Sequence, residues 1–171
     1  MDDDDLLPAE RKVLERLGHL PLDFRAMGAV SNLFRASAAI RRHMESSILA
    51  PDKLSWTSFV AMWVLWVWGE MESRDLAAAV GISRPTSTGV VTTLEGRGWV
   101  ERHKNPADGR MVRVALTPGG ERKIADLFPR FNAEERALTA HLSADEQDAM
   151  AAMLRSMLRT VEPGSRGELE G

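Results

Sequence analysis

The chain of 171 residues contains no cysteine and no tyrosine, and it is not basic, with a formal net charge of −3. Without cysteine, disulfides, thiolate zinc sites, cysteine nucleophiles and cysteine redox sensing are excluded. The longest uninterrupted apolar run, 59–68, is too short to span a bilayer. The first residues, Met-Asp-Asp-Asp-Asp, are acidic, unlike a signal peptide. These absences predict a cytoplasmic protein with no membrane partner.

Several kinds of catalytic site are also missing. The sequence has no phosphate-cradling glycine loop, no nucleophile elbow and no metal-ligand cluster, so we expect no catalytic residues, no metal, no cofactor and no enzyme activity. Four dispersed histidines, with no pair at the i, i+4 spacing of a helical metal site, give a zinc sensor little support. The nine methionines are more typical of packing than of oxidation sensing.

Hydrophobic residues make up 44% of the chain, enough for one domain with helical arms. Apolar residues at three- and four-residue spacing predict a long amphipathic helix over about 23–48, after a short helix that begins near Pro8. Ser55 is a candidate N-cap for a helix over about 56–68. That helix is apolar all round, so we expect it to be covered on every side.

Three shorter elements follow. We expect a helix from Glu72 or Ser73 to Val80, then Gly81, then a helix capped by Ser83 that runs to about Arg97. Residues 99–104 and 111–116 alternate as two strands around a turn at 105–109. A long helix capped by Thr117 should reach about His141, bending at Pro129, and a last helix should cover 144–160.

Three helices followed by a hairpin, within 55–116, indicate a winged helix-turn-helix. The fold class is therefore mainly α with a small two- to three-stranded β-wing. The charge is segregated in the same region: residues 97–113 carry five basic and two acidic residues, and 84–123 carry eight and four. The rest of the chain therefore has a net charge of −7. A basic turn after a helix-turn-helix favours a surface for DNA phosphates.

The wing sequence carries a family resemblance. Asp108-Gly-Arg110-Met-Val-Arg-Val114-Ala-Leu116-Thr117 resembles the Asp-x-Arg-x-x-x-(apolar)-x-Leu-Thr signature of the multiple-antibiotic-resistance regulator (MarR) family. Leu76-Ala77 with Gly81-Ile82-Ser83, the stretch 94–102 and Thr117-Pro-Gly-Gly120 extend the similarity, which covers about residues 25–160. Members are homodimeric, ligand-responsive transcription regulators, mostly repressors.

The resemblance implies a role for each part of the chain. Residues 1–22 would be an acidic tail and short helix, 23–50 and 118–162 N- and C-terminal dimerisation helices, 51–117 the DNA-binding domain, and 163–171 a flexible tail. The partners would be double-stranded DNA, a second copy and a small-molecule effector. The dimer would place two recognition helices about 34 Å apart on a pseudo-palindromic operator.

The same resemblance implies DNA contacts. In the recognition helix they are Arg84, Thr86, Ser87, Thr88, Thr92 and Thr93, and in the wing Arg102, Lys104, Asp108, Arg110 and Arg113. Arg110 would enter the minor groove, and Asp108 would hold the wing by pairing with Arg110 or Arg113. The threonines, taken alone, are equally typical of a solvated helix face.

One departure from the family stands in the recognition helix, where basic residues are usual at the positions of Gly89 and Thr93. Glycine there costs roughly 1 kcal/mol of helix stability relative to alanine. This departure supports an alternative function, a winged-helix dimer that binds a protein partner and has little affinity for DNA. Arg110 and the basic segment argue against it.

The effector site is the least defined. The tryptophan-rich helix offers one wall, and the first long helix offers cations for an anionic aromatic ligand. The candidate residues are Arg41, His43, Trp56, Val60, Trp63, Val64 and Trp68. Plain core and interface packing is the alternative reading of the same residues.

Overall fold

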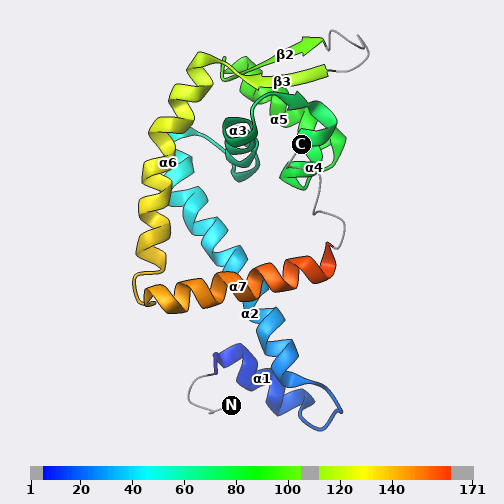
Figure 1. Ribbon diagram of the computed structural model, residues 1–171. Helices are drawn as coiled ribbons and strands as arrows, with labels where there is room; N and C mark the ends of the chain where they lie inside the picture. Colours follow the sequence, from blue (N-terminus) through cyan, green and yellow to red (C-terminus); the bar gives the residue numbers. More distant parts are fainter. Residues whose placement is uncertain (1–5, 105–111, 163–171) are drawn as a thin grey trace. The chain divides into compact units, whose positions relative to one another are not determined.

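The computed structural model describes residues 6–104 and 112–162. It divides into two compact units, 1–43 and 44–171. Helices dominate, and one small sheet lies in the second unit (Figure 1). The predicted fold class, a mainly α protein with a small β-wing, is confirmed.

The first unit consists of two helices, α1 (Pro8–Leu17) and most of α2 (Phe24–Met44). Asp23 begins α2 because its Oδ1 accepts hydrogen bonds of 3.0 Å from the backbone N–H groups of Arg25 and Ala26. Asn32 Nδ2 donates to Glu10 Oε1 at 2.9 Å and so ties α2 to α1.

The long helix predicted over 23–48 changes character at its end. After Met44 the chain forms a π-helical turn, η2 (Glu45–Leu49), and then a 3₁₀ turn, η3 (Ala50–Asp52). Pro51 has no N–H, and its ring would clash with the carbonyl of residue 47 in a regular helix. The altered turns accommodate this proline.

The winged helix-turn-helix occupies the start of the second unit. Its helices are α3 (Trp56–Trp68), α4 (Ser73–Val80) and α5 (Arg84–Gly96), and all three lie within a residue or two of their predicted bounds. Ser55 caps α3 as predicted, since its Oγ accepts a bond of 3.2 Å from Ser58 N. Gly81 has φ +72°, a left-handed conformation that favours glycine and allows the tight turn between α4 and α5.

The sheet has three strands, β1 (Met71–Glu72), β2 (Val100–Lys104) and β3 (Val112–Leu116). All pairs are antiparallel, in the order β1-β3-β2. Val100 pairs with Leu116 and Arg102 with Val114, which fixes the hairpin register. The two long strands were predicted. Alternation over two residues carries no signal, so the sequence did not locate β1.

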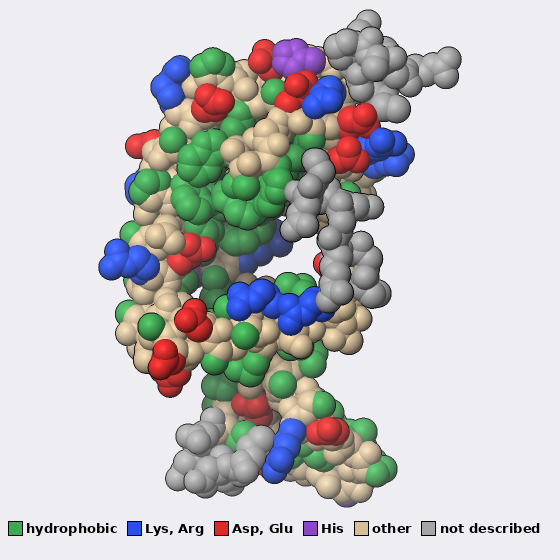
Figure 2. Space-filling view, viewed as in Figure 1, with side chains coloured by type: hydrophobic (Ala, Val, Ile, Leu, Met, Phe, Trp, Pro, Cys, Tyr) green, Lys and Arg blue, Asp and Glu red, His purple; other side chains and the backbone are tan. Residues whose placement is uncertain are grey.

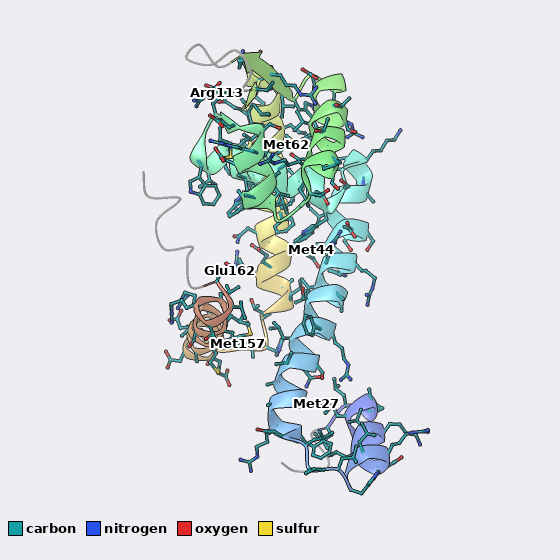
Figure 3. The ribbon with its side chains drawn as sticks, turned by 90° about the vertical axis from the view of Figure 1, so that its right-hand side faces the viewer. Met27, Met44, Met62, Arg113, Met157 and Glu162 are labelled. Atoms are coloured by element: carbon teal, nitrogen blue, oxygen red, sulfur yellow. The ribbon has the colours of Figure 1, made fainter. Side chains whose placement is uncertain are left out.

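The core of the second unit lies between α3, α5, α6 and the sheet, with Met44 and Met62 inside it (Figure 3). Its most deeply buried side chains are Met44, Leu49, Met62, Leu76, Val91, Leu94, Val100, Val114, Ile124 and Leu127. Burial of these apolar side chains is the main favourable contribution to packing the wing on its helices. It positions α5 and β2 against each other.

The helix α6 (Pro118–Leu138) begins against the wing. Thr117 Oγ1 donates to Gly98 O at 2.6 Å and accepts from Gly120 N at 3.0 Å. A Cβ at position 120 would overlap the carbonyl oxygen of Trp99, so this close approach requires glycine. The helix continues through Pro129 and ends three residues earlier than the predicted His141.

The last helix, α7 (Ala144–Val161), begins with a capping box formed by Ser143 and Glu146, close to the predicted start at 144. Its Gln147 donates to the carbonyls of Thr139 and Leu142, which stabilises the turn that ends α6. None of the 18 residues of α7 is buried in the described chain. Five of its large apolar side chains are exposed: Met150, Met153, Met157, Leu158 and Val161.

The expectation that α3 is covered on every side is wrong for the described part of the chain. Its inner side is buried through Phe59, Met62 and Leu65. Its last turn is not, because Trp66 is 41% exposed, Val67 52% and Trp68 40%. The end of α3 therefore leaves a large apolar surface open.

Candidate DNA-binding surface

The helix-turn-helix presents the N-terminal end of α5 to solvent. Ser83 Oγ accepts from the backbone N–H of Thr86 at 3.3 Å and lies 2.7 Å from its hydroxyl. Arg84, the first residue of α5, is exposed. The start of this helix therefore offers a positive dipole end and a cation on the same side.

The helix α5 has a buried and an exposed face. Val91 and Leu94 are buried, whereas Val90 is only partly buried. The predicted contact residues Thr86, Thr88, Thr92 and Thr93 are exposed. Ser87 is 2% exposed and belongs to the buried face. The structure thus corrects the placement of Ser87 among the DNA contacts, since a side chain in the core cannot reach a base edge.

Arg102, on β2, turns back onto α5. Its Nη1 lies 2.7 Å from Glu95 Oε2, and its Nη2 donates to Thr92 Oγ1 at 2.8 Å. A further bond of 3.2 Å joins Nη2 to the carbonyl of Thr88. The side chain is 30% exposed. Arg102 therefore joins wing to recognition helix, a role that the sequence analysis did not assign to it.

Arg113, on β3, has a similar anchoring contact. Its Nε lies 3.1 Å from Glu70 Oε1, and its Nη2 donates to the carbonyl of Glu70 at 3.1 Å. Asp108 and Arg110, and hence their predicted pairing, lie outside the described residues. Lys104 ends β2. Of the two predicted partners of Asp108, Arg113 thus has Glu70 as its partner in the described chain.

Asp52, at the end of the turn η3, links this turn to α6. Its carboxylate lies 2.6 Å from Lys123 Nζ and 2.9 Å from Arg130 Nη2, both on α6. The hydrogen bond from Lys123, and secondly that from Arg130, lower the pKa of Asp52 despite its partial burial. Arg97 binds the same turn, donating to the carbonyls of Asp52 and Lys53.

Two residues counted in the basic segment, Arg97 and Lys123, thus have structural partners. Their cationic groups also lie over the ring of Trp99, at 4.9 and 5.8 Å from its centroid. The role of Asp52 was not predicted, because its partners on α6 are more than 70 residues away along the chain. Only the neighbouring Pro51 indicated a turn there.

Comparison with known proteins agrees with this geometry. The MarR family model matches residues 54–112. An uncharacterised HTH-type transcriptional regulator of Bacillus subtilis, YwaE, is 34% identical over 151 residues, which are 86% of this chain and 88% of YwaE. The chain belongs to the MarR family of transcription regulators.

Two further similarities cover less of the sequence. The transcriptional repressor MprA of Escherichia coli K12 is 28% identical over 92 residues, or 54% of this chain and 52% of MprA. The structure of Bordetella bronchiseptica BpsR, solved to explain regulation of its DNA binding by 6-hydroxynicotinic acid, superposes with a TM-score of 0.65 at 26% identity. That match covers 75% of this chain and 98% of BpsR.

Membership of the MarR family makes the protein a DNA-binding transcription regulator rather than an enzyme. In the two described stretches, no group of histidine, aspartate and glutamate could hold a metal ion. No described helix is long and apolar enough to cross a membrane.

The MarR-family regulator also carries a continuous apolar surface. Figure 2 shows hydrophobic side chains gathered over α3 and its junction with α6. Trp66 lies 5.7 Å from Phe128 of α6, and Trp63 lies edge-on to Trp68 at 5.3 Å, measured between ring centroids. From Phe128 the aromatic contacts lead inward through Phe131 to Phe59.

The residues predicted for an effector do not form one group on this surface. Trp68 is exposed and Val60 and Trp63 are half-buried, whereas Val64 is 2% exposed and belongs to the core. Trp56 packs on Phe59 and Phe131 at centroid distances of 6.3 and 6.0 Å. The structure therefore corrects Val64 to a core residue. Trp66 and Phe128 were not among the predicted residues, although the apolar composition of α3 indicated that its whole surface needs to be covered.

Proposed function

We propose that this MarR-family regulator binds a pseudo-palindromic operator as a homodimer, acts as a repressor, and is released by a small aromatic or anionic molecule. The observation that carries the proposal is the exposed outer face of α5 beside β2, inside a segment with more basic than acidic residues. A helix of this kind fits the major groove, and its wing the adjacent minor groove.

In this proposal α5 reads the major groove through Arg84, Thr86, Thr88, Thr92 and Thr93. Arg110, Lys104 and Asp108 form the part of the wing that meets DNA. Arg102 and Arg113 act by positioning, since their guanidinium groups bind Glu95 and Glu70. Segment 51–117 is thus the DNA-binding domain.

We propose that the segments 23–50 and 118–162 form the dimer. The apolar side of α7 supports this role, because an 18-residue helix with five exposed large apolar side chains needs a partner surface. Phe34 of α2 is 70% exposed, and Val30 and Ile40 of the same helix are exposed too. A second copy of the chain supplies matching surfaces by two-fold symmetry.

A repressor role is supported by the similarity to MprA, which is named a transcriptional repressor. A dimer that occupies two half-sites about 34 Å apart covers roughly twenty base pairs, enough to block a promoter. The test is transcription in vitro from a promoter that contains the operator. We expect added protein to lower transcript yield, whereas a rise would make the protein an activator.

The apolar surface around Trp66 and Phe128 is the proposed effector site. An aromatic ring stacked there would remove apolar area from water, and BpsR, a structural relative, is regulated by an aromatic acid. Arg41 and His43 belong to the first unit, and their role as ligand contacts stays a prediction. Titrating tryptophan fluorescence with aromatic acids, 6-hydroxynicotinate included, tests the site. No change with any acid would argue against it.

Release by an effector requires linkage between the two sites. A ligand that favours a different separation of the recognition helices lowers operator affinity, and the operator must then lower ligand affinity by the same factor. The check is ligand affinity with and without saturating operator. Equal affinities would exclude this mechanism.

The operator proposal itself is tested by fluorescence anisotropy. Labelled duplex from the region upstream of the gene is compared with a scrambled duplex, using the wild type and Arg110→Ala. We expect selective binding that the substitution weakens. Weak binding without preference for either duplex would count against an upstream operator and favour the protein-interaction function.

A further inference from the structure

The outer face of α5 is polar in composition, but its hydroxyl groups are already used. Thr88 Oγ1 donates to the carbonyl of Arg84 at 3.1 Å, and Thr93 Oγ1 donates to the carbonyl of Gly89 at 2.9 Å. In both cases the hydroxyl donates its hydrogen bond to a backbone carbonyl of the same helix. What remains for a ligand is the γ-methyl group and the oxygen lone pairs.

The other hydroxyls of this face are engaged as well. Thr86 Oγ1 shares a bond of 2.7 Å with Ser83 Oγ, and Thr92 Oγ1 accepts from Arg102. Arg84 is the only basic residue of α5, and it stands at the first position. The middle of the helix therefore carries no cationic donor for the O6 and N7 acceptors of guanine, the commonest specific contact.

Gly89 lies between these threonines on the exposed side. A Cβ built at this position meets no atom within 4 Å, so packing within the described chain does not require glycine. Alanine would make the helix more stable. A glycine that the fold does not need, on the face that meets DNA, allows the helix backbone to approach a base edge closely.

We propose that α5 recognises thymine by apolar contact between its C5-methyl group and the methyl groups of Thr88 and Thr93, with Gly89 leaving room for the approach. This proposal rests on the proposed operator function and specifies its chemistry. Among the four bases only thymine presents a methyl group in the major groove, and threonine methyls are suited to contact it. Specificity then comes from shape and burial of methyl groups rather than from arginine–guanine hydrogen bonds.

The test uses the full chain and a duplex selected by it from a randomised pool. All thymines of the selected duplex are replaced by deoxyuridine, which removes only the C5-methyl groups and leaves the base-pairing edges and the minor groove unchanged. Loss of one buried methyl contact corresponds to about a fourfold loss of affinity. With one contact in each half-site, we expect the uridine duplex to bind at least tenfold more weakly, and replacing one thymine at a time to locate the effect.

Two variants separate the methyl group from the hydroxyl. Thr93→Val keeps a methyl and removes the hydroxyl, and we expect it to bind the thymine duplex within twofold of the wild type. Thr93→Ser keeps the hydroxyl and removes the methyl. We expect it to lose several-fold in affinity and to become less sensitive to uridine in place of the thymine that Thr93 contacts. The same pair at Thr139, whose hydroxyl bonds the carbonyl of Glu135 on α6, serves as the control.

The outcomes separate the inference from the function on which it rests. If the pool yields no duplex that binds better than a scrambled one, the operator function fails, and the inference fails with it. If selected duplexes bind tightly but the uridine duplex binds equally well, the operator function stands and methyl recognition is refuted. Weak binding by Thr93→Val with normal binding by Thr93→Ser would assign recognition to the hydroxyl instead.

Discussion

The guanidinium of Arg102 lies 2.7 Å from the carboxylate of Glu95 and so joins strand β2 to the recognition helix α5. Both side chains are partly exposed, at 30% and 41%. An ion pair of this kind contributes at most about 1 kcal/mol to folding. Its value lies in geometry, because DNA binding needs the helix and the wing at a fixed mutual position.

We therefore expect Arg102→Ala to weaken operator binding about tenfold without changing its salt dependence. Loss of a phosphate contact lowers the slope of log affinity against log salt by about one, whereas loss of a positioning contact does not. Glu95→Gln removes the charge that pairs with Arg102, and we expect it to weaken operator binding as well, but by less than Arg102→Ala. Anisotropy titrations over a salt series measure both quantities. A slope reduced by one in Arg102→Ala would show a direct phosphate contact.

Asp52 should contribute to stability in a pH-dependent way. Because its hydrogen bonds with Lys123 and Arg130 lower its pKa in the folded state, the stabilisation is present above the unfolded pKa and is lost as pH falls through the folded-state pKa. At pH 7 we expect Asp52→Asn to lower the free energy of unfolding by roughly 1–2 kcal/mol. The difference in free energy of unfolding between variant and wild type should become smaller at pH values below 3.8, the ordinary pKa of an aspartate.

Urea unfolding at several pH values measures that difference. Asp126→Asn is the matched control, since Asp126 lies 3.6 Å from the same Arg130 and its side chain is 75% exposed. We expect it to change the free energy of unfolding by less than about 0.5 kcal/mol. A difference for Asp52→Asn that stays constant down to pH 2 would contradict the lowered pKa.

Gly89→Ala should separate stability from DNA binding. Alanine in the interior of α5 should raise the free energy of unfolding by roughly 0.5–1 kcal/mol, because glycine loses more conformational freedom on folding. The added methyl faces open space in the free protein, so no clash opposes the gain. On the operator the same methyl occupies the space of a base edge, and affinity should fall several-fold. Thermal denaturation measures the change in stability, and anisotropy on the same preparation measures the change in operator affinity. An unchanged affinity would show that DNA binding does not require glycine at position 89.

The apolar side of α7 should be needed for self-association. Met153 is 63% exposed, and Met153→Glu places a charge in the proposed interface. We therefore expect the dissociation constant of the dimer to rise at least tenfold. Ala152→Glu introduces the same charge on the opposite side of the helix and is expected to have little effect. Sedimentation velocity over a concentration series distinguishes them. Identical behaviour of the two variants would place the interface elsewhere.

Local signals predicted the order of elements well. Ser55, Ser83 and Thr117 mark helix starts through caps that need only neighbouring residues, and α3, α5 and α6 begin where these caps predict. Period-two alternation located β2 and β3. The two-residue strand β1 and the π-helical turn after Met44 escaped, because the first has no period and the second depends on how Pro51 is accommodated.

The roles of individual side chains were harder to predict. Arg102 reads as a DNA contact in sequence, but Glu95 and the carbonyl of Thr88 meet it only once the strand packs on the helix. Ser87 is polar and stands among contact residues, yet helical periodicity turns it into the core. The contacts of Arg102 join separate segments of the chain, which composition and spacing do not encode, whereas the burial of Ser87 follows from its four-residue spacing to Val91.

Hydroxyl-radical footprinting of the selected duplex shows directly whether a dimer of this MarR-family regulator reads two half-sites through α5 and the wing. We expect protection related by two-fold symmetry, with half-site centres one helical turn, or about 34 Å, apart. We also expect minor-groove protection outside each centre, lost in Arg110→Ala. A single asymmetric protected region, or uniform protection that shifts with duplex length, would mean that the protein does not bind two symmetric half-sites as a dimer.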